Sequence, residues 1–194
     1  DVYKRQLVFD APAQTNIAKQ IEKVAPEFKP VEQWREGNAT VLRFTADNGL
    51  APELSRDGAD WLIDLRPRLT RPVTDVAVEV KAVDGRTEIF FPLEGGSHVV
   101  ELQDPDLKDR LLVVPVAIPG LGLDEPRAFP QFRALGTAQG LALIPFSDAV
   151  RAIPGEDGLR VTSNAGLLIS RESKDAKVFS GQRGSGRSRR LFDL

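Results

Sequence analysis

The sequence predicts an all-β fold of successive antiparallel hairpin units, sandwich-like or propeller-like, with one short helix near the N-terminus. Hairpins are indicated by short apolar runs after Phe28 that are bounded by turn dipeptides. These are Asn48-Gly49, Asp57-Gly58, Asp84-Gly85, Gly95-Gly96 and Asp157-Gly158. Helical spacing of apolar residues occurs in one segment, between Ile17 and Ala25. The chain has 194 residues, of which 41% are hydrophobic, so it is long enough to bury a substantial core.

The predicted helix is amphipathic and docks one face on a core. Its apolar residues are Ile17, Ile21, Val24 and Ala25. Either Thr15 or Asn16 can cap its first turn, and Pro26 stops it.

The register of one hairpin follows from its turn. A two-residue Asp84-Gly85 turn pairs Val78 with Phe91 and Lys81 with Glu88. Apolar pairs then share one face of the hairpin and the charge pair shares the other. We expect Val76, Val78 and Val80 to pack on a second layer, and the face with Lys81 and Glu88 to be half solvated.

Three strand-like runs place a proline before their last apolar residue: 89–93, 112–116 and 142–146. Proline cannot donate a backbone hydrogen bond, so it is confined to sheet edges, strand ends or bulges. The runs suggest a recurring β-unit that ends at an edge or a bulge. Longer blocks at 40–65, 86–116 and 139–162 lie roughly 50 residues apart, a spacing typical of propeller blades or of a row of small sandwiches.

Composition excludes several classes of site. The net charge is −2, which does not favour nucleic-acid binding. With no cysteine and a single histidine, thiolate and two-histidine metal sites are excluded.

Methionine is absent even at position 1, so we expect a piece of a longer protein. Residues 1–6 resemble the translated remnant of a sequencing adapter, and we leave them out of the fold as a non-native leader. The longest apolar stretch, 111–123, is too short and too rich in proline and glycine to span a membrane.

The last part of the chain differs from the rest in composition. Residues 171–194 hold seven basic and three acidic residues, with glycine and serine between them. This composition predicts a flexible linker to a missing C-terminal region. An anionic partner is disfavoured, because no aromatic residue interrupts the basic stretch 181–190 to stack on a base.

Two groups of acidic residues are spaced as in a calcium-binding site or a glycosidase active site. Asp104, Asp106 and Asp109 are spaced as closely as calcium ligands, but the glycine and glutamate of an EF-hand loop are missing, so we interpret them as a polar turn. Trp61 stands among three aspartates, as in glycosidase sites: Asp57, Asp60 and Asp64. We interpret Asp57 as a turn residue and Trp61 as part of the core or of a sheet surface.

No other motif indicates catalysis. Ser97 and His98 are neighbours on an extended segment, so their side chains point to opposite faces and cannot share a proton. The glycines at 120–122 and 181–186 lack the Gly-Lys-Ser/Thr ending of a phosphate-binding loop. We therefore predict no catalytic residue, no metal ligand and no cofactor.

Six blocks of the sequence resemble a known arrangement: 7–13, 39–44, 55–65, 109–116, 132–146 and 190–194. Together they are similar to the β-rich N-terminal region of long, uncharacterised proteobacterial proteins that carry tetratricopeptide-type repeats further on. The first block is also similar to the AMIN-type envelope module. This resemblance implies an AMIN-like module with the short helix at 7–70, repeated antiparallel β-units at 71–170, the linker at 171–194, and a periplasmic or envelope location.

The functional expectation is a non-enzymatic structural and protein-interaction module of a larger envelope-associated protein. Its partners would be other proteins, the remaining domains of its own chain, or peptidoglycan. One alternative is a peptidoglycan- or carbohydrate-binding module that uses Trp34 or Trp61; the other is a glycan hydrolase that depends on the carboxylates of Asp60 and Asp64. Binding is expected at a β-edge or an aromatic surface.

Overall fold

The computed structural model describes residues 2–25, 31–47, 50–58, 60–67, 71–94, 98–103 and 109–169. This part of the chain consists mostly of β-strands with one short helix, and all its strand pairs but one short one are antiparallel. The predicted all-β class is therefore confirmed.

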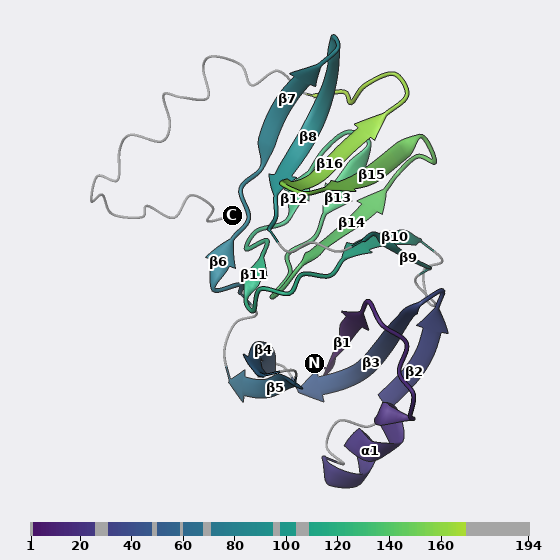
Figure 1. The fold of residues 1–194 in the computed structure, drawn as a ribbon, viewed down its shortest axis with the longest axis vertical. Helices are drawn as coiled ribbons and strands as arrows, with labels where there is room; N and C mark the ends of the chain where they lie inside the picture. The colour runs from purple at the N-terminus through teal and green to yellow at the C-terminus, as the bar shows by residue number, and fades with distance from the viewer. Residues whose placement is uncertain are drawn as a thin grey trace, which may run out of the picture.

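Two sheets face one another as a β-sandwich (Figure 1). The four-stranded sheet has the order β15-β16-β8-β7, with β7 (Glu79–Val83), β8 (Arg86–Pro92), β15 (Val150–Gly155) and β16 (Gly158–Ser163). The five-stranded sheet has the order β12-β13-β14-β10-β9, with β9 (Val100–Gln103), β10 (Arg110–Val114), β12 (Arg127–Ala128), β13 (Phe132–Ala134) and β14 (Leu141–Pro145).

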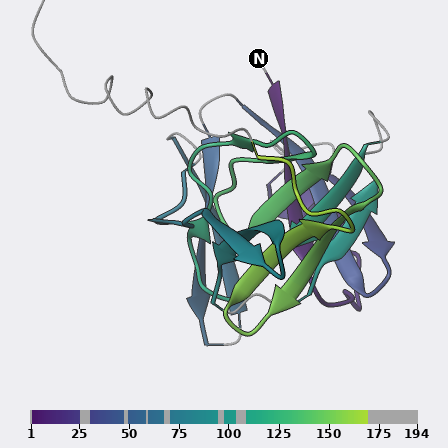
Figure 2. The ribbon, with the colours of Figure 1, turned by 90° about the horizontal axis from the view of Figure 1, so that it is seen from above.

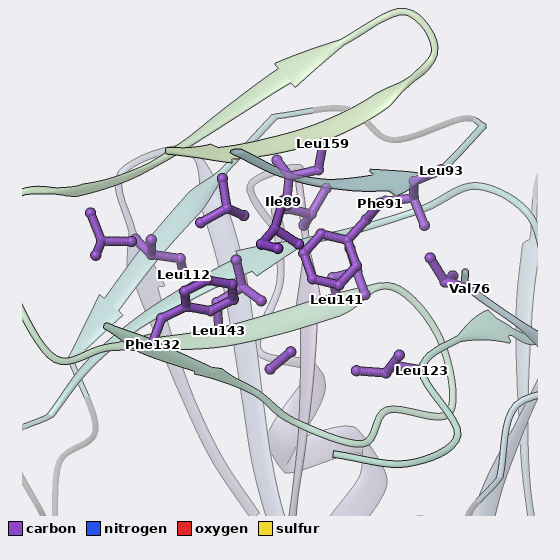
Figure 3. Close-up of a cluster of buried hydrophobic side chains, with 14 of the residues drawn as sticks. Val76, Ile89, Phe91, Leu93, Leu112, Leu123, Phe132, Leu141, Leu143 and Leu159 are labelled. Atoms are coloured by element: carbon purple, nitrogen blue, oxygen red, sulfur yellow. The ribbon is translucent and has the colours of Figure 1, made fainter. Parts of the chain in front are cut away.

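The main hydrophobic core lies between these two sheets. Alternate residues of each strand point inward, so Ile89 and Phe91 are fully buried while Phe90 between them is not. Figure 3 shows side chains of both sheets meeting in this core, among them Leu112, Phe132, Leu141, Leu143 and Leu159. This cluster is the largest buried cluster among the described residues.

A second unit at the N-terminus packs on the outside of the sandwich. Its sheet has the order β1-β3-β2, with β1 (Val2–Phe9), β2 (Val31–Glu36) and β3 (Ala39–Asp47). One face of β3 carries Phe44 toward helix α1 (Ile17–Val24), and the other carries Val41 toward Val100 and Leu102 of β9. Figure 2 looks along this stack, with the sandwich nearer the viewer and the N-terminal strands behind it.

Two small sheets complete the described fold. Strands β4 (Leu50–Asp57) and β5 (Asp60–Pro67) form an antiparallel hairpin. Strands β6 (Thr74–Asp75) and β11 (Leu121–Gly122) pair in parallel below the sandwich. No helix in the described ranges is long and apolar enough to cross a membrane.

The glycines near β11 allow backbones to approach closely. A Cβ added at Gly122 would lie 2.5 Å from the carbonyl oxygen of Thr137, and one at Gly140 would lie 2.5 Å from that of Val114. The Thr137 hydroxyl accepts a hydrogen bond from the Leu123 N–H and donates one to the Gly140 carbonyl. Gly122 therefore serves close packing at this end of the sandwich.

The helix prediction is confirmed, and the structure selects its cap. The Asn16 side chain accepts a hydrogen bond of 2.9 Å from the Lys19 N–H, which identifies Asn16 and not Thr15 as the N-cap. The helix ends at Val24, with Ala25 as the C-cap.

The predicted register of the Asp84-Gly85 hairpin is confirmed along β7, where Lys81 lies opposite Glu88. The expected pair of Val78 with Phe91 lies beyond the ladder, because β7 begins at Glu79. Val78 still packs against the core. The expected burial of the valine face is wrong at Val80, which is 60% exposed because β7 is an edge strand.

The prolines stand at strand ends, as expected, but in interior strands. Pro92 and Pro145 are the last residues of β8 and β14, and Pro115 follows the last residue of β10. Each of these strands has a neighbour on both sides. The prolines are tolerated because the ladder on one side has already ended: β7 begins at Glu79, opposite Phe90, and the β10–β14 pairing ends at Leu143. The expected edge is therefore found only locally, where one neighbouring ladder has ended, and the strands as a whole are interior.

The structure does not bear out a repeat of hairpin units. Within 40–65, 86–116 and 139–162, corresponding strands join different sheets with different partners. The facing sheets form a sandwich and not the blades of a propeller. The segment Val2–Gln6, which we left out of the fold, extends β1 along β3. The turns at 48–49 and 95–96 and the predicted linker at 171–194 lie outside the described residues.

Candidate interaction surface

The two tryptophans proposed as ligand-binding residues lie on strands of different sheets. Trp34 lies on β2 opposite Val41, and its half-buried side chain packs against the cluster between the N-terminal sheet and β9–β10. Its position is explained by packing between layers. Trp61 lies on β5 opposite Arg56, and its side chain is outside the described part of the structure.

The acidic residues near Trp61 come together in pairs on the β4–β5 hairpin. Asp57 lies opposite Asp60, and Glu53 lies opposite Asp64. The side chains of the three aspartates are exposed. General acids of glycosidases lie in buried, apolar surroundings, whereas these three side chains are exposed.

The remaining sequence candidates that the structure describes are exposed. His98 is exposed just before β9. Asp109 is also exposed, while Asp104 and Asp106 lie outside the described residues. Among the residues that the structure describes, no three His, Asp or Glu side chains are grouped closely enough to hold a metal ion.

One ion pair has clear electrostatic consequences. Arg110 on β10 donates two hydrogen bonds to Glu101 on β9, from Nε to Oε1 (2.6 Å) and from Nη2 to Oε2 (2.9 Å). These bonds lower the pKa of Glu101, although desolvation opposes the shift. The same bonds raise the pKa of Arg110, with a smaller contribution from Asp148. The pair links an edge strand to its neighbour.

The structure places an open, apolar strand edge at β7. Residues of an antiparallel ladder alternate between pairs that exchange backbone hydrogen bonds and pairs that do not. Val83 and Arg86 flank a two-residue turn and form the first hydrogen-bonded pair, so Lys81 and Glu79 also bond to β8. The N–H and C=O groups of Val80 and Ala82 therefore point away from the sheet, where no described strand pairs with them.

The side chains of β7 form two different faces around this edge. Val80 is exposed on the side of the sandwich core, and Val83 near the turn is exposed on the opposite side. On that opposite side, the Lys81 ammonium lies 3.3 Å from the centroid of the Phe90 ring and 3.3 Å from the carboxylate of Glu79. The edge thus offers outward backbone groups that no described strand pairs with, an apolar side chain and one charge of each sign.

The other edge of the same sheet has fewer outward N–H groups. In the β15–β16 hairpin, Gly155 and Gly158 flank the two-residue turn, so the outward positions of β15 are Val150, Ala152 and Pro154. The Val150 N–H already donates to the Ser147 carbonyl, and Pro154 has no N–H. Only Ala152 retains an outward N–H on β15.

The sequence identified the hairpin that contains β7 but not the open edge. The Asp84-Gly85 turn was the available signal, because it fixes which backbone groups point outward. The strand order could not be seen in the sequence. It depends on β16, which lies some 70 residues later in the chain and pairs with β8 rather than with β7.

Comparisons with known proteins identify no relative of this chain: no protein-family model, no curated protein and no solved structure matches it.

Proposed function

We propose that the chain is a non-enzymatic protein-interaction module that belongs to a larger, envelope-associated protein. The open β7 edge is the observation that carries the interaction part of this proposal. Exposed strand edges with apolar side chains are templates for pairing with another chain, and soluble proteins usually block them. The place in an envelope protein, exported to the periplasm, is supported by the sequence resemblance alone.

The enzymatic and carbohydrate-binding alternatives receive less support from the described residues. Asp60 and Asp64 are exposed on a two-stranded hairpin, and Trp34 is engaged in packing between sheets. Neither arrangement offers the buried acid or the open aromatic platform that those functions need.

Site-specific crosslinking tests the interaction proposal. A photoreactive amino acid at Val80 should form adducts with a protein partner, identified by mass spectrometry and reproduced with that partner in pure form. The same group at Ile153, which is also exposed but lies on the β15 edge with its proline, is the matched control. Equal labelling at both positions, or none at Val80, contradicts the proposal.

An activity assay tests the enzymatic alternative in parallel. The chain is incubated with peptidoglycan and with chromogenic glycosides and esters, and we expect no product. Product release that disappears in Asp60→Asn or Asp64→Asn would replace the interaction proposal with a hydrolase. Sedimentation with peptidoglycan that Trp34→Ala or Trp61→Ala abolishes would favour the carbohydrate-binding alternative.

A further inference from the structure

We propose that the partner of the β7 edge is a second copy of this chain, paired antiparallel across a two-fold axis that passes through Val80. This inference rests on the proposed function and names its partner. In a symmetric pair the same edge meets itself, so the sequence of β7 must be complementary to its own reverse.

The charges on β7 select one register. In the dimer, backbone hydrogen bonds can form only between residues whose N–H and C=O groups point outward from β7. The two-fold axis must therefore place Val80 and Ala82 of one copy opposite outward-pointing residues of the other copy. With Val80 on the axis, Glu79 of each copy lies opposite Lys81 of the other, and Val78 lies opposite Ala82. Both charge pairs are attractive, and both remaining kinds of pair are apolar.

The neighbouring registers are unfavourable. An axis through Lys81 places two ammonium groups opposite each other, and an axis through Glu79 places two carboxylates opposite each other. An axis through Ala82 moves Lys81 opposite Val83 and leaves the charges without complementary partners. The pattern Val78-Glu79-Val80-Lys81-Ala82 therefore matches its own reverse in one register.

The geometry of the monomer supports this register. Glu79 and Lys81 share one face of β7, where their side chains already lie 3.3 Å apart. Across the axis they would form two neighbouring Glu–Lys pairs on that face. Val80 and its symmetry mate would contact each other on the opposite face, which removes an exposed valine from water.

The pairing would join two four-stranded sheets into one sheet of eight strands. The contact involves one short strand from each copy, so it belongs to the class of small, weak interfaces. Its dissociation constant should fall in the micromolar to millimolar range, and salt should weaken it through the charge pairs.

Analytical ultracentrifugation of charge-reversal variants tests the register. Glu79→Lys alone brings the new ammonium group opposite Lys81 of the other copy, and Lys81→Glu alone brings the new carboxylate opposite Glu79. Each variant should therefore dimerise about tenfold or more weakly than the wild type. An equimolar mixture of the two variants restores both attractive pairs and should form a heterodimer. Circular dichroism checks that each variant is folded.

A third variant tests the axis even if a charge reversal disturbs the fold. Val80→Glu places two like charges at the axis and should abolish dimerisation, and Val80 is exposed enough for the monomer to tolerate the change. Val73→Glu, at a position that is 75% exposed and outside β7, is the matched control and should not alter it.

The outcomes separate this inference from the proposed function. A wild-type chain that stays monomeric up to about 1 mM, a dimer that the β7 variants do not weaken, or a mixture that fails to restore pairing overturns the self-association. If the crosslinker at Val80 then captures a different protein, the interaction module stands with another partner. If it captures nothing, both proposals fail.

Discussion

The two edges of the four-stranded sheet differ in the number of backbone N–H groups that point outward. Both β7 and β15 are short strands joined to their neighbour by two-residue turns. On β15 a proline and a local hydrogen bond remove two of the three outward N–H groups, at Pro154 and Val150. On β7 both Val80 and Ala82 carry an outward N–H group, and no described strand pairs with them.

Within the described residues, the sheet is therefore better protected against pairing at β15 than at β7. Proteins block strand edges because free edges aggregate, so an edge that carries Pro154 follows the usual rule. The β7 edge departs from it while retaining one partial safeguard, the charged pair Glu79 and Lys81. That pair disfavours most registers of association and favours one, which suits specific pairing better than random aggregation.

The largest expected effect is a difference in stability loss between two residues that lie opposite each other, one buried and one exposed. Ile89 and Val80 lie opposite each other, but Ile89 is fully buried against the second sheet. Ile89→Ala should lower the free energy of unfolding by about 2–5 kcal/mol through lost burial and a cavity. Val80→Ala should change it by less than about 0.5 kcal/mol. Chemical denaturation at low protein concentration measures both, and similar costs would show that the edge is part of the monomer core.

A proline scan tests which backbone groups of β7 face outward. Lys81→Pro removes a hydrogen bond to β8 and should cost about 2–3 kcal/mol. Ala82→Pro removes an outward N–H and should cost less than about 1 kcal/mol in the monomer, while it weakens pairing at the edge. Thermal denaturation gives the costs. A larger loss at Ala82 than at Lys81 would reverse the assignment of inward and outward groups.

The smallest expected effect is the contribution of one ion pair to the stability of the fold. The pair links β9, an edge strand of the five-stranded sheet, to its neighbour β10. The pKa of Glu101 is lowered in the folded chain, so its ion pair with Arg110 stabilises the fold at neutral pH and this contribution is lost as the pH falls through the carboxyl pKa. Because both side chains are partly exposed, the contribution should stay below about 1 kcal/mol. Denaturation of wild type and Glu101→Gln should therefore converge toward acid pH. A difference that is constant with pH contradicts this origin.

Local features of the fold could be predicted from the sequence because their causes are local. The cap and spacing of α1 indicated a helix at Ile17, and the Asp84-Gly85 turn fixed the register that brings Lys81 opposite Glu88. The alternation of apolar residues indicated the buried face of β8. In each case, residues close in sequence carry the information.

Features that depend on distant segments could not be predicted. Strand order is set by pairings such as β16 with β8 and β10 with β14, whose partners are far apart in the chain. The exposure of Val80 follows from that order, as does the interior position of the strands that end in proline. The same limit applies to Trp34, whose packing depends on a sheet that follows it in sequence.

Amide hydrogen exchange measured by NMR at several protein concentrations tests the open β7 edge most directly. If a second copy pairs with this edge, the outward amides of Val80 and Ala82 become more protected as the concentration rises. The Lys81 amide, already bonded to β8, and the Ala152 amide on the opposite edge should not change. Protection of Val80 and Ala82 that is independent of concentration, or that changes equally at Ala152, would show that the β7 edge does not pair with a second copy.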